Sequence, residues 1–365
     1  MNVKKVLIIA GGTGGHVFPA LVVAQYLRTE QIDVFWMGTM RGLEGRILPQ
    51  TTFPFYALKI SGLRRKSILQ RLMAGWQLLH AFFQALFIIY KNKPDVVLAM
   101  GGYASGPGGL AAWVLRKKLI LHEQNTAMGL TNRILSRFAT RVLTGFPNTS
   151  GVPDSKKVLY VGNPVREDIS KVESPDVRFQ HRKDDPLHVL ILGGSQGAAA
   201  LNKIVPETVV LLKDKPMIWH VAGPKQITET RDIYRAKQID AQVDPFVTDM
   251  AAAYTWADVV ICRAGALTIA ELMAAGVASI LVPYPFAADQ HQMTNARFLS
   301  DKQAAILIEE KDLTPQKLTT FLTKWMANRD DLLVMAKTAK SLYRPDSILQ
   351  IGRVIQHSNS FNFIK

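Results

Sequence analysis

The chain has a single cysteine, Cys262, among its 365 residues. One cysteine cannot form an intramolecular disulfide, argues against a metal site built from thiolates, and is typical of a protein from a reducing compartment. Cys262 ends the apolar run DVVIC, so we expect a buried and unreactive thiol. The N-terminus, MNVKKVLII, has two lysines and an apolar run but no small-residue cleavage site, which favours a first β-strand over a secretion signal.

Several signatures of nucleotide binding are also missing. The first glycine turn reads GGTGG rather than G-x-G-x-x-G, and the next predicted strand, DVFWMG, ends without an acid that could hold a nicotinamide ribose. Both differences disfavour an NAD-dependent dehydrogenase. The chain contains neither a G-x-x-x-x-G-K-[ST] phosphate loop nor a D-x-D motif. We therefore expect no metal or other cofactor; Ser195, backbone N–H groups and a helix N-terminus would neutralise a diphosphate instead.

No apolar run is both long and free of polar groups. The most hydrophobic stretch, LMAGWQLLHAFFQALFIIY (72–90), carries Gln77, His80 and Gln84 at a spacing that places them on one helix face. The pattern predicts an amphipathic helix with a narrow polar stripe rather than a transmembrane span. One face of this helix would cover a sheet. Because its aromatic side chains cannot all point inward, we expect another face to lie in a lipid interface.

Positive charge is in excess, with a net charge of +15 at neutral pH. Nucleic acid, an anionic membrane surface, a polyanionic substrate or simple solubility would each account for it. The positions favour a membrane surface, because basic residues stand beside aromatic and aliphatic ones. The predicted membrane-binding residues are Arg64, Arg65, Lys66, Trp76, Leu79, Phe82, Phe83 and Trp113, with Arg71 and Arg116–Lys118 nearby.

Apolar runs alternate with helix-like segments, which predicts an α/β fold with parallel sheets covered by helices. A strand, a glycine turn and a helix follow one another in VLIIAGGTGGH (6–16), whose helix would run from His16 to Thr29, and similarly in HVLILGGSQGA (188–198). A length of 365 residues predicts two domains. The similarity of these two segments indicates a duplicated Rossmann-like unit, joined near 160–186. The predicted strands are 6–10, 34–37, 96–100, 119–122, 141–144, 188–192, 217–222, 259–262 and 279–283, and the segment 314–357 is predicted to be helical.

Polar residues follow the ends of these strands, at the edge where parallel sheets bind ligands. They are His16, Glu123, Gln124, Asn125, Ser195, Gln196, Thr268, Glu271, Asp289, His291, Gln292 and Asn295. Glycine turns after buried strands indicate a large ligand between two domains. His16 is a candidate base, because a neutral imidazole can take a hydroxyl proton; the alternative is a helix-start residue that bonds its own loop. Glu271 is either a surface helix acid or a ligand for ribose hydroxyls.

Seven motifs occur in order over nearly the whole chain: GGTGGHVFPA (11–20), GGYASGP (101–107), HEQN (122–125), GNPVR (162–166), GGSQGA (193–198), DMAAAYTWADVVICRAGALTIAEL (249–272) and DQHQxxNA (289–296). Together they closely resemble the MurG family of peptidoglycan glycosyltransferases. The resemblance implies a GT-B fold, in which two Rossmann-like domains with parallel sheets face each other across a cleft. It implies the inverting, metal-independent transfer of N-acetylglucosamine (GlcNAc) from UDP-GlcNAc. The acceptor would be the C4 hydroxyl of N-acetylmuramic acid (MurNAc) in undecaprenyl-diphospho-MurNAc-pentapeptide (lipid I), and the product lipid II.

The resemblance also implies roles for individual residues. His16 would be the catalytic base. In the donor site, Ser195 and Arg166 would lie at the diphosphate, Val247 at uracil, Glu271 at the ribose and Gln292 at the GlcNAc hydroxyls. The donor set would be completed by Thr13, Gly14, Gly15, Asn125, Ala266, Leu267, Thr268, Ile269 and Ala270, and the acceptor diphosphate would face Gly101, Gly102, Tyr103 and Ser105. His291 and Met293 stand where the family varies.

Three segments follow from the resemblance: an acceptor- and membrane-binding domain (1–162), a donor-binding domain (163–340) and a helical segment (341–365) that packs back on the first domain. The expected partners are UDP-GlcNAc, lipid I and an anionic phospholipid surface, with cell-wall synthesis proteins as further candidates. No nucleic acid is expected, since nucleic-acid binding would not explain the glycine turns. The protein would be peripheral at the cytoplasmic face of the bacterial inner membrane. A UDP-GlcNAc 2-epimerase of the same fold is the alternative, and it would need no apolar helix beside a basic cluster.

Overall fold

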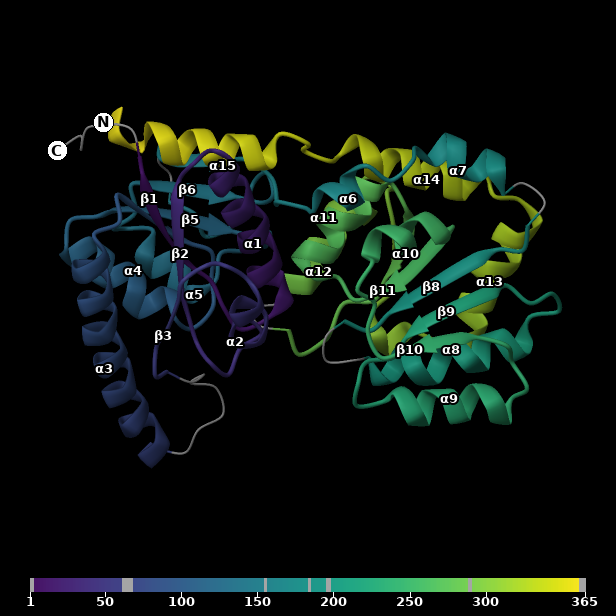
Figure 1. The fold of residues 1–365 in the computed structure, drawn as a ribbon. Helices are drawn as coiled ribbons and strands as arrows, with labels where there is room; N and C mark the ends of the chain where they lie inside the picture. Colours follow the sequence, from purple (N-terminus) through teal and green to yellow (C-terminus); the bar gives the residue numbers. More distant parts are fainter. Residues whose placement is uncertain are drawn as a thin grey trace. The chain divides into compact units, whose positions relative to one another are not determined.

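The structure is a computed structural model that describes residues 3–60, 68–153, 156–182, 185–194, 198–287 and 291–360. The chain divides into two compact units (Figure 1). Unit 1 comprises residues 1–164 together with 346–365, and unit 2 comprises residues 165–345. Each unit has its own parallel sheet and its own hydrophobic core.

The sheet of unit 1 has seven described strands in the order β3-β2-β1-β4-β5-β6-β7, and all neighbouring pairs are parallel. Alternate side chains of a strand point to opposite faces, and in β1 Val6 and Ile8 enter one core whereas Leu7 and Ile9 enter another. Burial on both faces explains why β1 reads as an unbroken apolar run. The strands are β1 (Lys5–Ile9), β2 (Asp33–Gly38), β3 (Phe55–Ala57), β4 (Val96–Ala99), β5 (Lys118–Glu123), β6 (Arg141–Thr144) and β7 (Val158–Tyr160).

Helices cover both faces of this sheet. α15 packs on α1, with Gly352 so close to the Tyr26 ring that a Cβ atom at position 352 would clash with it. Since α15 follows unit 2 in the chain, the C-terminal segment returns to unit 1 (Figure 1). The helices are α1 (Gly14–Thr29), α2 (Glu44–Ile47), α3 (Ile68–Asn92), α4 (Ser105–Val114), α5 (Leu130–Leu135) and α15 (Ser347–Gln356), with 3-10 turns η1 (Leu48–Gln50) and η4 (His357–Ser360).

The sheet of unit 2 has six described strands in the order β10-β9-β8-β11-β12-β13, again all parallel. They are β8 (His188–Leu192), β9 (Met217–Val221), β10 (Gln242–Asp244), β11 (Val259–Cys262), β12 (Ala278–Leu281) and β13 (Ile306–Leu307). The helices are α6 (Glu167–Ser170), α7 (Pro175–His181), α8 (Ala199–Leu211), α9 (Ile227–Ala236), α10 (Met250–Trp256), α11 (Ala266–Ala275), α12 (His291–Ser300), α13 (Pro315–Ala327) and α14 (Asp330–Ser341), with the 3-10 turn η3 (Glu310–Asp312).

The predicted α/β fold class is confirmed. All nine predicted strands form, with bounds within two residues of the prediction, and the predicted helix at 16–29 begins two residues earlier, at Gly14. Cys262 is fully buried, and burial raises the pKa of its thiol to about 12, as expected for an unreactive cysteine. Four short strands were not predicted, namely β3, β7, β10 and β13.

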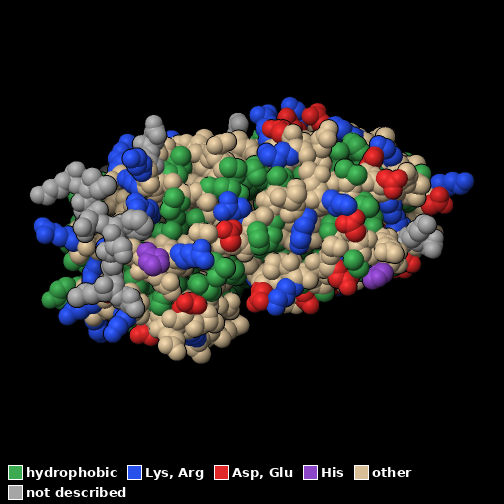
Figure 2. Space-filling view, turned by 90° about the horizontal axis from the view of Figure 1, so that it is seen from above, with side chains coloured by type: hydrophobic (Ala, Val, Ile, Leu, Met, Phe, Trp, Pro, Cys, Tyr) green, Lys and Arg blue, Asp and Glu red, His purple; other side chains and the backbone are tan. Residues whose placement is uncertain are grey.

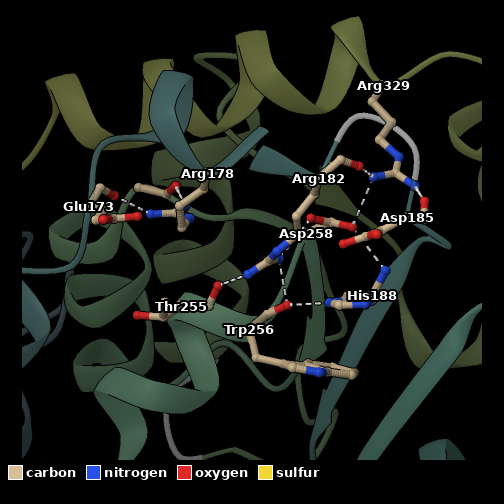
Figure 3. Close-up of polar contacts among 10 residues, drawn as sticks. Glu173, Arg178, Arg182, Asp185, His188, Thr255, Trp256, Asp258 and Arg329 are labelled. Carbon is tan, nitrogen blue, oxygen red and sulfur yellow. Dashed lines mark hydrogen bonds and ion pairs between the residues drawn. The ribbon is translucent and has the colours of Figure 1, made fainter. Parts of the chain in front are cut away.

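A buried ion-pair network closes the amino edge of the unit 2 sheet (Figure 3). Asp258, just before β11, pairs with Arg182 at 2.9 Å and with Arg329 at 3.5 Å, and its carboxylate accepts the N–H of His188 at 2.9 Å. Arg182 also donates to the carbonyl oxygens of Thr255 and Trp256. These contacts tie the start of unit 2 and the residue before α14 to the first residues of β8 and β11. Because parallel sheets bind ligands at their carboxyl edge, we interpret this charged cluster as a support of the fold.

Candidate active site

Three loops meet at the carboxyl edge of the unit 1 sheet. β1 and β4 are neighbours, but the chain continues from β1 toward β2 and from β4 toward β5, in the opposite direction. Such a switch point is where α/β sheets bind ligands. The loop after β1 carries Thr13, and the loop after β4 carries Tyr103; Asn125 follows β5, the next strand. The structure therefore brings the predicted residues of unit 1 to one edge.

His16 is held in the first turn of α1. Its ring nitrogen Nδ1 lies 3.3 Å from the carbonyl oxygen of Gly11. Since a carbonyl oxygen can only accept, Nδ1 carries the proton in this contact, and the lone pair of the neutral ring is on Nε2. His16 thus bonds its own loop, as the structural alternative expected, and this same bond selects the tautomer that a general base requires.

The loop after β4 packs against the His16 ring through Gly101. This residue has a φ of +106°, and a Cβ atom there would lie 2.6 Å from Cδ2 of His16. Glycine is thus required both by the backbone conformation and by the close approach. The Gly11 N–H donates to the Gly101 carbonyl at 3.2 Å, which joins the two glycine turns directly.

The other residues predicted to bind the acceptor substrate differ in exposure. Tyr103 is 50% exposed, and Gly102 packs on the backbone of Gly11. Ser105 is fully buried, and its hydroxyl accepts the Gly101 N–H at 3.2 Å. The Ser105 side chain therefore builds the turn, and contact between this loop and an acceptor stays a prediction.

Asn125 is positioned by Glu123, the last residue of β5. Oε1 of Glu123 accepts both the backbone N–H and the side-chain amide of Asn125, at 3.1 and 3.0 Å. Oε2 accepts the Asn132 amide at 2.8 Å and the Gly129 N–H at 3.2 Å. Glu123 is 3% exposed, so its carboxylate is occupied by the donors around it and holds the loop that carries Asn125.

His122 has a structural part in the same strand. Burial lowers the pKa of His122 to about 4, so the ring is neutral at physiological pH. Its Nε2–H donates to the Gly162 carbonyl at 3.0 Å, and Nδ1 accepts the Gln124 amide at 3.1 Å. This fully occupied ring links β5 to the segment that leads out of unit 1.

In unit 2 the corresponding switch point lies between β8 and β11. Ser195 and Gln196, predicted to follow β8, lie outside the described residues. β11 is followed by Gly265, the N-cap of α11, which has no side chain to accept the N–H groups of the first turn. These N–H groups are suited to an anion or a hydroxyl. The first two turns contain the predicted residues Ala266, Leu267, Thr268, Ile269, Ala270 and Glu271.

Glu271 is not a surface acid, because it is only 9% exposed. Its Oε2 accepts the hydroxyl of Tyr254, a fully buried residue of α10, at 2.9 Å. Burial raises the pKa of Glu271 to about 7, whereas the hydrogen bond from Tyr254 and the charge of Arg166 act to lower it. A carboxyl group held near its ionisation point at neutral pH is typical of a functional site.

Arg166 and the loop after β10 lie beside this carboxyl. Arg166 donates to the carbonyl oxygen of Thr248 at 3.4 Å, next to the predicted uracil-binding residue Val247. The structure thus brings Arg166, Val247 and Glu271 to one side of unit 2. Gln292, in the first turn of α12, accepts the backbone N–H of Tyr284 through Oε1 at 2.8 Å. This contact fixes the amide so that its NH₂ group is the end able to donate to a ligand.

Comparisons with known proteins identify the family. Two family models match, the glycosyltransferase family 28 N-terminal domain over residues 6–144 and the family 28 C-terminal domain over residues 188–351. A relative from Coxiella burnetii, named UDP-N-acetylglucosamine–N-acetylmuramyl-(pentapeptide) pyrophosphoryl-undecaprenol N-acetylglucosamine transferase, is 46% identical over 353 residues, which cover 95% of this chain and 97% of the relative. The crystal structure of Acinetobacter baumannii MurG is 40% identical, with a TM-score of 0.81, over 97% of this chain and 99% of that one. The chain belongs to the MurG family.

Membership of the MurG family confirms the GT-B fold and the glycosyltransferase class. A crystal structure of a UDP-N-acetylglucosamine 2-epimerase covers 99% of this chain with a TM-score of 0.69, but it is only 11% identical. That likeness extends to the fold alone. The epimerase alternative is therefore less well supported than transfer chemistry.

This MurG-family chain carries an exposed apolar stripe on α3. Trp76, Leu79, Phe83 and Phe87 follow one another at helical spacing, and three of them are 73%, 58% and 65% exposed (Trp76, Phe83 and Phe87). Ala81, Ala85 and Ile89 on another face of α3 enter the core, with Phe82 packed partly against it. The predicted helix at 72–90 thus has a core face and an exposed apolar face. Among the described helices, none is long and apolar enough to cross a membrane.

Two neighbouring helices of unit 1 also expose apolar side chains. α3 packs on α4, and α4 packs on α5. Exposed apolar side chains on these two helices include Leu110 and Trp113 of α4 and Leu130 and Ile134 of α5. We call the exposed side chains of these three helices the α3–α4–α5 apolar face. Arg64, Arg65 and Lys66, predicted to flank it, lie outside the described residues.

The net charge of the chain resides in unit 1. This unit has 22 Lys and Arg against 7 Asp and Glu, whereas unit 2 has 22 of each. On the face shown in Figure 2, Lys and Arg prevail over unit 1 but are interspersed with Asp and Glu over unit 2. Two of the seven acids of unit 1, Glu44 and Glu123, are buried. Unit 1, which carries the apolar face, is therefore strongly basic as a whole.

Proposed function

We propose that the chain transfers GlcNAc from UDP-GlcNAc to the C4 hydroxyl of MurNAc in lipid I and so produces lipid II. The Coxiella burnetii relative is named as a transferase of N-acetylglucosamine for an N-acetylmuramyl-(pentapeptide) pyrophosphoryl-undecaprenol. Its identity to this chain extends over almost the full length of both proteins. Transfer is therefore the chemistry that the site must perform.

The orientation of the His16 ring carries the chemical part of the proposal. The Gly11 carbonyl accepts a hydrogen bond from Nδ1–H of the ring, so Nε2 is the nitrogen that takes the proton of the C4 hydroxyl. As this proton moves, the C4 oxygen bonds to C1 of GlcNAc, and the bond from C1 to the β-phosphate oxygen of UDP breaks. A single displacement inverts the α-linked donor into a β1→4 linkage. General-base assistance of this kind accelerates a reaction roughly 10²–10⁴-fold.

We assign the donor chiefly to unit 2. The Glu271 carboxylate would accept the ribose hydroxyls, the backbone at Val247 would bind uracil, and the NH₂ group of Gln292 would donate to the sugar. Arg166, Ser195 and the first-turn N–H groups of α11 would stabilise the negative charge that develops on departing UDP. These groups take the place of a metal ion in the proposed reaction. Thr13, Gly14, Gly15 and Asn125 of unit 1 would complete the sugar site.

The acceptor is anchored in a membrane by its undecaprenyl chain, so the enzyme must work at a lipid surface. We propose that the α3–α4–α5 apolar face dips into this surface while the basic groups of unit 1 bind anionic headgroups. UDP-GlcNAc is a soluble nucleotide sugar, which favours the cytoplasmic face of the inner membrane as the place of reaction. Cell-wall synthesis proteins remain candidate partners there.

The first test is transfer of radiolabelled GlcNAc from UDP-GlcNAc to a short-chain lipid I analogue in the presence of EDTA. We expect labelled product, which would support the donor, the acceptor and metal independence together. Binding of UDP-GlcNAc without transfer would contradict the acceptor assignment and make epimerisation the next reaction to measure.

We expect His16→Ala mainly to lower kcat and Glu271→Ala mainly to raise the donor KM. Unchanged kinetics in either variant would count against the role assigned to it.

A further inference from the structure

Glu44, the first residue of α2, has a fully buried carboxylate that no part of the proposed reaction uses. Its Oε1 accepts the backbone N–H and the hydroxyl of Thr39, each at 2.8 Å, and its Oε2 accepts the backbone N–H of Gly12 at 2.8 Å. A buried carboxylate is costly unless donors surround it. Here three donors do so, and one of them belongs to the glycine turn that precedes His16.

Glycines enclose this carboxylate on several sides. A Cβ atom at Gly11 or Gly42 would overlap the carboxylate oxygens of Glu44, and a Cβ atom at Gly38 would lie 2.7 Å from its Cγ. The Leu43 N–H also donates to the Gly12 carbonyl at 3.2 Å. The Glu44 side chain is therefore locked between the glycine turn after β1 and the loop after β2.

One peptide group connects Glu44 to His16. The N–H of Gly12, which donates to Glu44, and the carbonyl of Gly11, which accepts from Nδ1 of His16, belong to the same peptide bond. We infer that Glu44 is a positioning residue that acts through the Gly11–Gly12 peptide to fix the orientation and the tautomer of the His16 ring. This inference rests on the proposed function, in which His16 is the base.

The physical basis is the rigidity and polarity of the peptide. Its N–H and C=O point in opposite directions within one plane, so a carboxylate fixed at one end sets the direction of the carbonyl at the other. Hydrogen bonds at the two ends polarise the peptide and strengthen each other. Gly12 has a φ of +93°, a conformation that L-residues with a side chain rarely adopt. In a Ser-His-Asp triad a carboxylate contacts Nδ1 of the histidine directly; here the peptide stands between them.

The test is Glu44→Gln in the full-length protein. The amide preserves the size of the side chain but must turn its NH₂ group toward either the Gly12 N–H or the Thr39 N–H. We expect kcat to fall at least about tenfold, yet less than in His16→Ala, since the whole contribution of a general base is roughly 10²–10⁴-fold. The donor KM should stay within about twofold, because the proposed donor contacts lie chiefly in unit 2. An unchanged kcat in folded Glu44→Gln would overturn the inference.

Asp95→Asn is the matched control. The Asp95 carboxylate accepts the backbone N–H groups of Lys4 and Lys5 at 2.8 and 2.9 Å. It therefore supports the beginning of β1, the strand that leads into the glycine turn, without touching the turn itself. We expect this variant to keep its kcat within about twofold of the unmodified enzyme. An equal loss of kcat in both variants would indicate general damage to unit 1 and contradict a specific role for Glu44.

A second measurement does not depend on activity. Nitrogen NMR of ¹⁵N-histidine-labelled protein at pH 8.5 distinguishes the two neutral tautomers, and the His16 signals are assigned by their loss in His16→Gln. We expect the Nδ1–H tautomer in the unmodified protein, and the other tautomer to appear in Glu44→Gln. An Nε2–H tautomer in the unmodified protein would overturn the inference. If the unmodified enzyme transfers no GlcNAc, the proposed function fails while the tautomer result still stands or falls separately.

Discussion

The hydroxyl of Tyr254 donates a 2.9 Å hydrogen bond to Oε2 of Glu271, and both residues are buried in unit 2. Burial raises the pKa of the Tyr254 hydroxyl well above its ordinary value, so the hydroxyl keeps its proton and donates it. The carboxyl that we assign to the ribose is thus held by a group on a different helix. Tyr254 lies in one of the motifs that resemble the MurG family (249–272), but only the structure shows what it contacts.

We expect Tyr254→Phe to weaken donor binding. The change leaves a buried acceptor of Glu271 without its donor, which costs about 1–3 kcal/mol, and it removes an interaction that lowers the pKa of Glu271. At pH 7.5 a larger share of Glu271 is then protonated, so the dissociation constant for UDP-GlcNAc should rise severalfold and recover in part at pH 9. Isothermal titration calorimetry measures this directly.

Tyr234→Phe is the matched control for that experiment. The Tyr234 hydroxyl is buried in the same unit and bonds Nδ1 of His220 at 2.9 Å, so the variant also loses a buried hydrogen bond. We expect its donor affinity to remain within about twofold of that of the unmodified protein. The assignment of Tyr254 would be contradicted by equal losses in the two variants.

The affinity for the donor should depend on pH around neutrality. The pKa of Glu271 is about 7 in the free protein, chiefly because of burial, and the charged and titratable groups facing it are Arg166, Asp168, Tyr254 and Cys262. Ribose hydroxyls donate best to the ionised carboxylate, so binding should be weak below this pKa and strengthen as the pH rises through it. Between pH 6 and pH 8 the ionised fraction grows roughly tenfold, and the dissociation constant should fall by about that factor.

Glu271→Gln tests the origin of this dependence. The amide does not titrate, so its donor affinity should be nearly constant between pH 6 and pH 8. A pH dependence that persists unchanged in Glu271→Gln would assign the titration to another group. A flat profile in the unmodified protein would contradict the role of Glu271 at the ribose.

Asp258 provides a prediction about stability rather than activity. Asp258→Ala leaves Arg182 and Arg329, whose side chains are only 14% and 16% exposed, without their buried carboxylate (Figure 3), and breaking such a pair costs about 3–5 kcal/mol. We expect a Tm lower by roughly 10 °C for unit 2, which has the size of one domain, with unchanged donor affinity at 20 °C. As a control, Asp176→Ala removes the exposed ion pair with Lys337 and should cost less than about 1 kcal/mol. A loss of donor affinity without a loss of stability in Asp258→Ala would show that the cluster serves the site.

Most of the fold could be predicted from the sequence because buried parallel strands read as continuous apolar runs. β1, β8 and β11 are buried on both faces and were found from this pattern. The missed strands are short and less buried: β7, at the edge of its sheet, has no fully buried residue, and β13 has only two residues. Edge strands are stabilised by a neighbouring strand rather than by their own pattern, so their sequence contains little signal.

The candidate site was predicted as a set of strand-end residues, but its internal contacts were not. His16, Asn125 and Glu271 were identified by their position after predicted strands or in glycine-led helices. The residues that hold them are Glu44, Glu123 and Tyr254. Glu123 lies only two residues from Asn125, but Glu44 contacts Gly12 and Tyr254 contacts Glu271 across 32 and 17 residues of sequence. Periodicity reports only local structure, and the signal that could have drawn attention to Glu44 is an acidic residue in a short segment rich in glycine, GTMRGLEG.

The α3–α4–α5 apolar face yields the prediction that separates membrane binding from catalysis. Phe83 and Phe87 are exposed on α3, and burying an exposed phenylalanine in an apolar phase is worth about 1.5–3 kcal/mol. We expect Phe83→Ser combined with Phe87→Ser to weaken binding to phosphatidylglycerol vesicles roughly tenfold or more, as measured by co-sedimentation. Transfer to a short-chain acceptor without vesicles should be unchanged, since neither side chain belongs to the proposed reaction.

Two further arms of this experiment test the apolar and the electrostatic contributions to vesicle binding separately. Val334→Ser alters an equally exposed apolar side chain on α14 of unit 2, whose formal net charge is zero, and should leave vesicle binding unchanged. Raising the salt concentration from 0.1 M to 1 M shortens the Debye length from about 10 Å to about 3 Å, so it should weaken binding of the unmodified protein to anionic vesicles by screening the basic surface of unit 1. Vesicle binding that resists both the phenylalanine substitutions and high salt would show that another surface makes the contact.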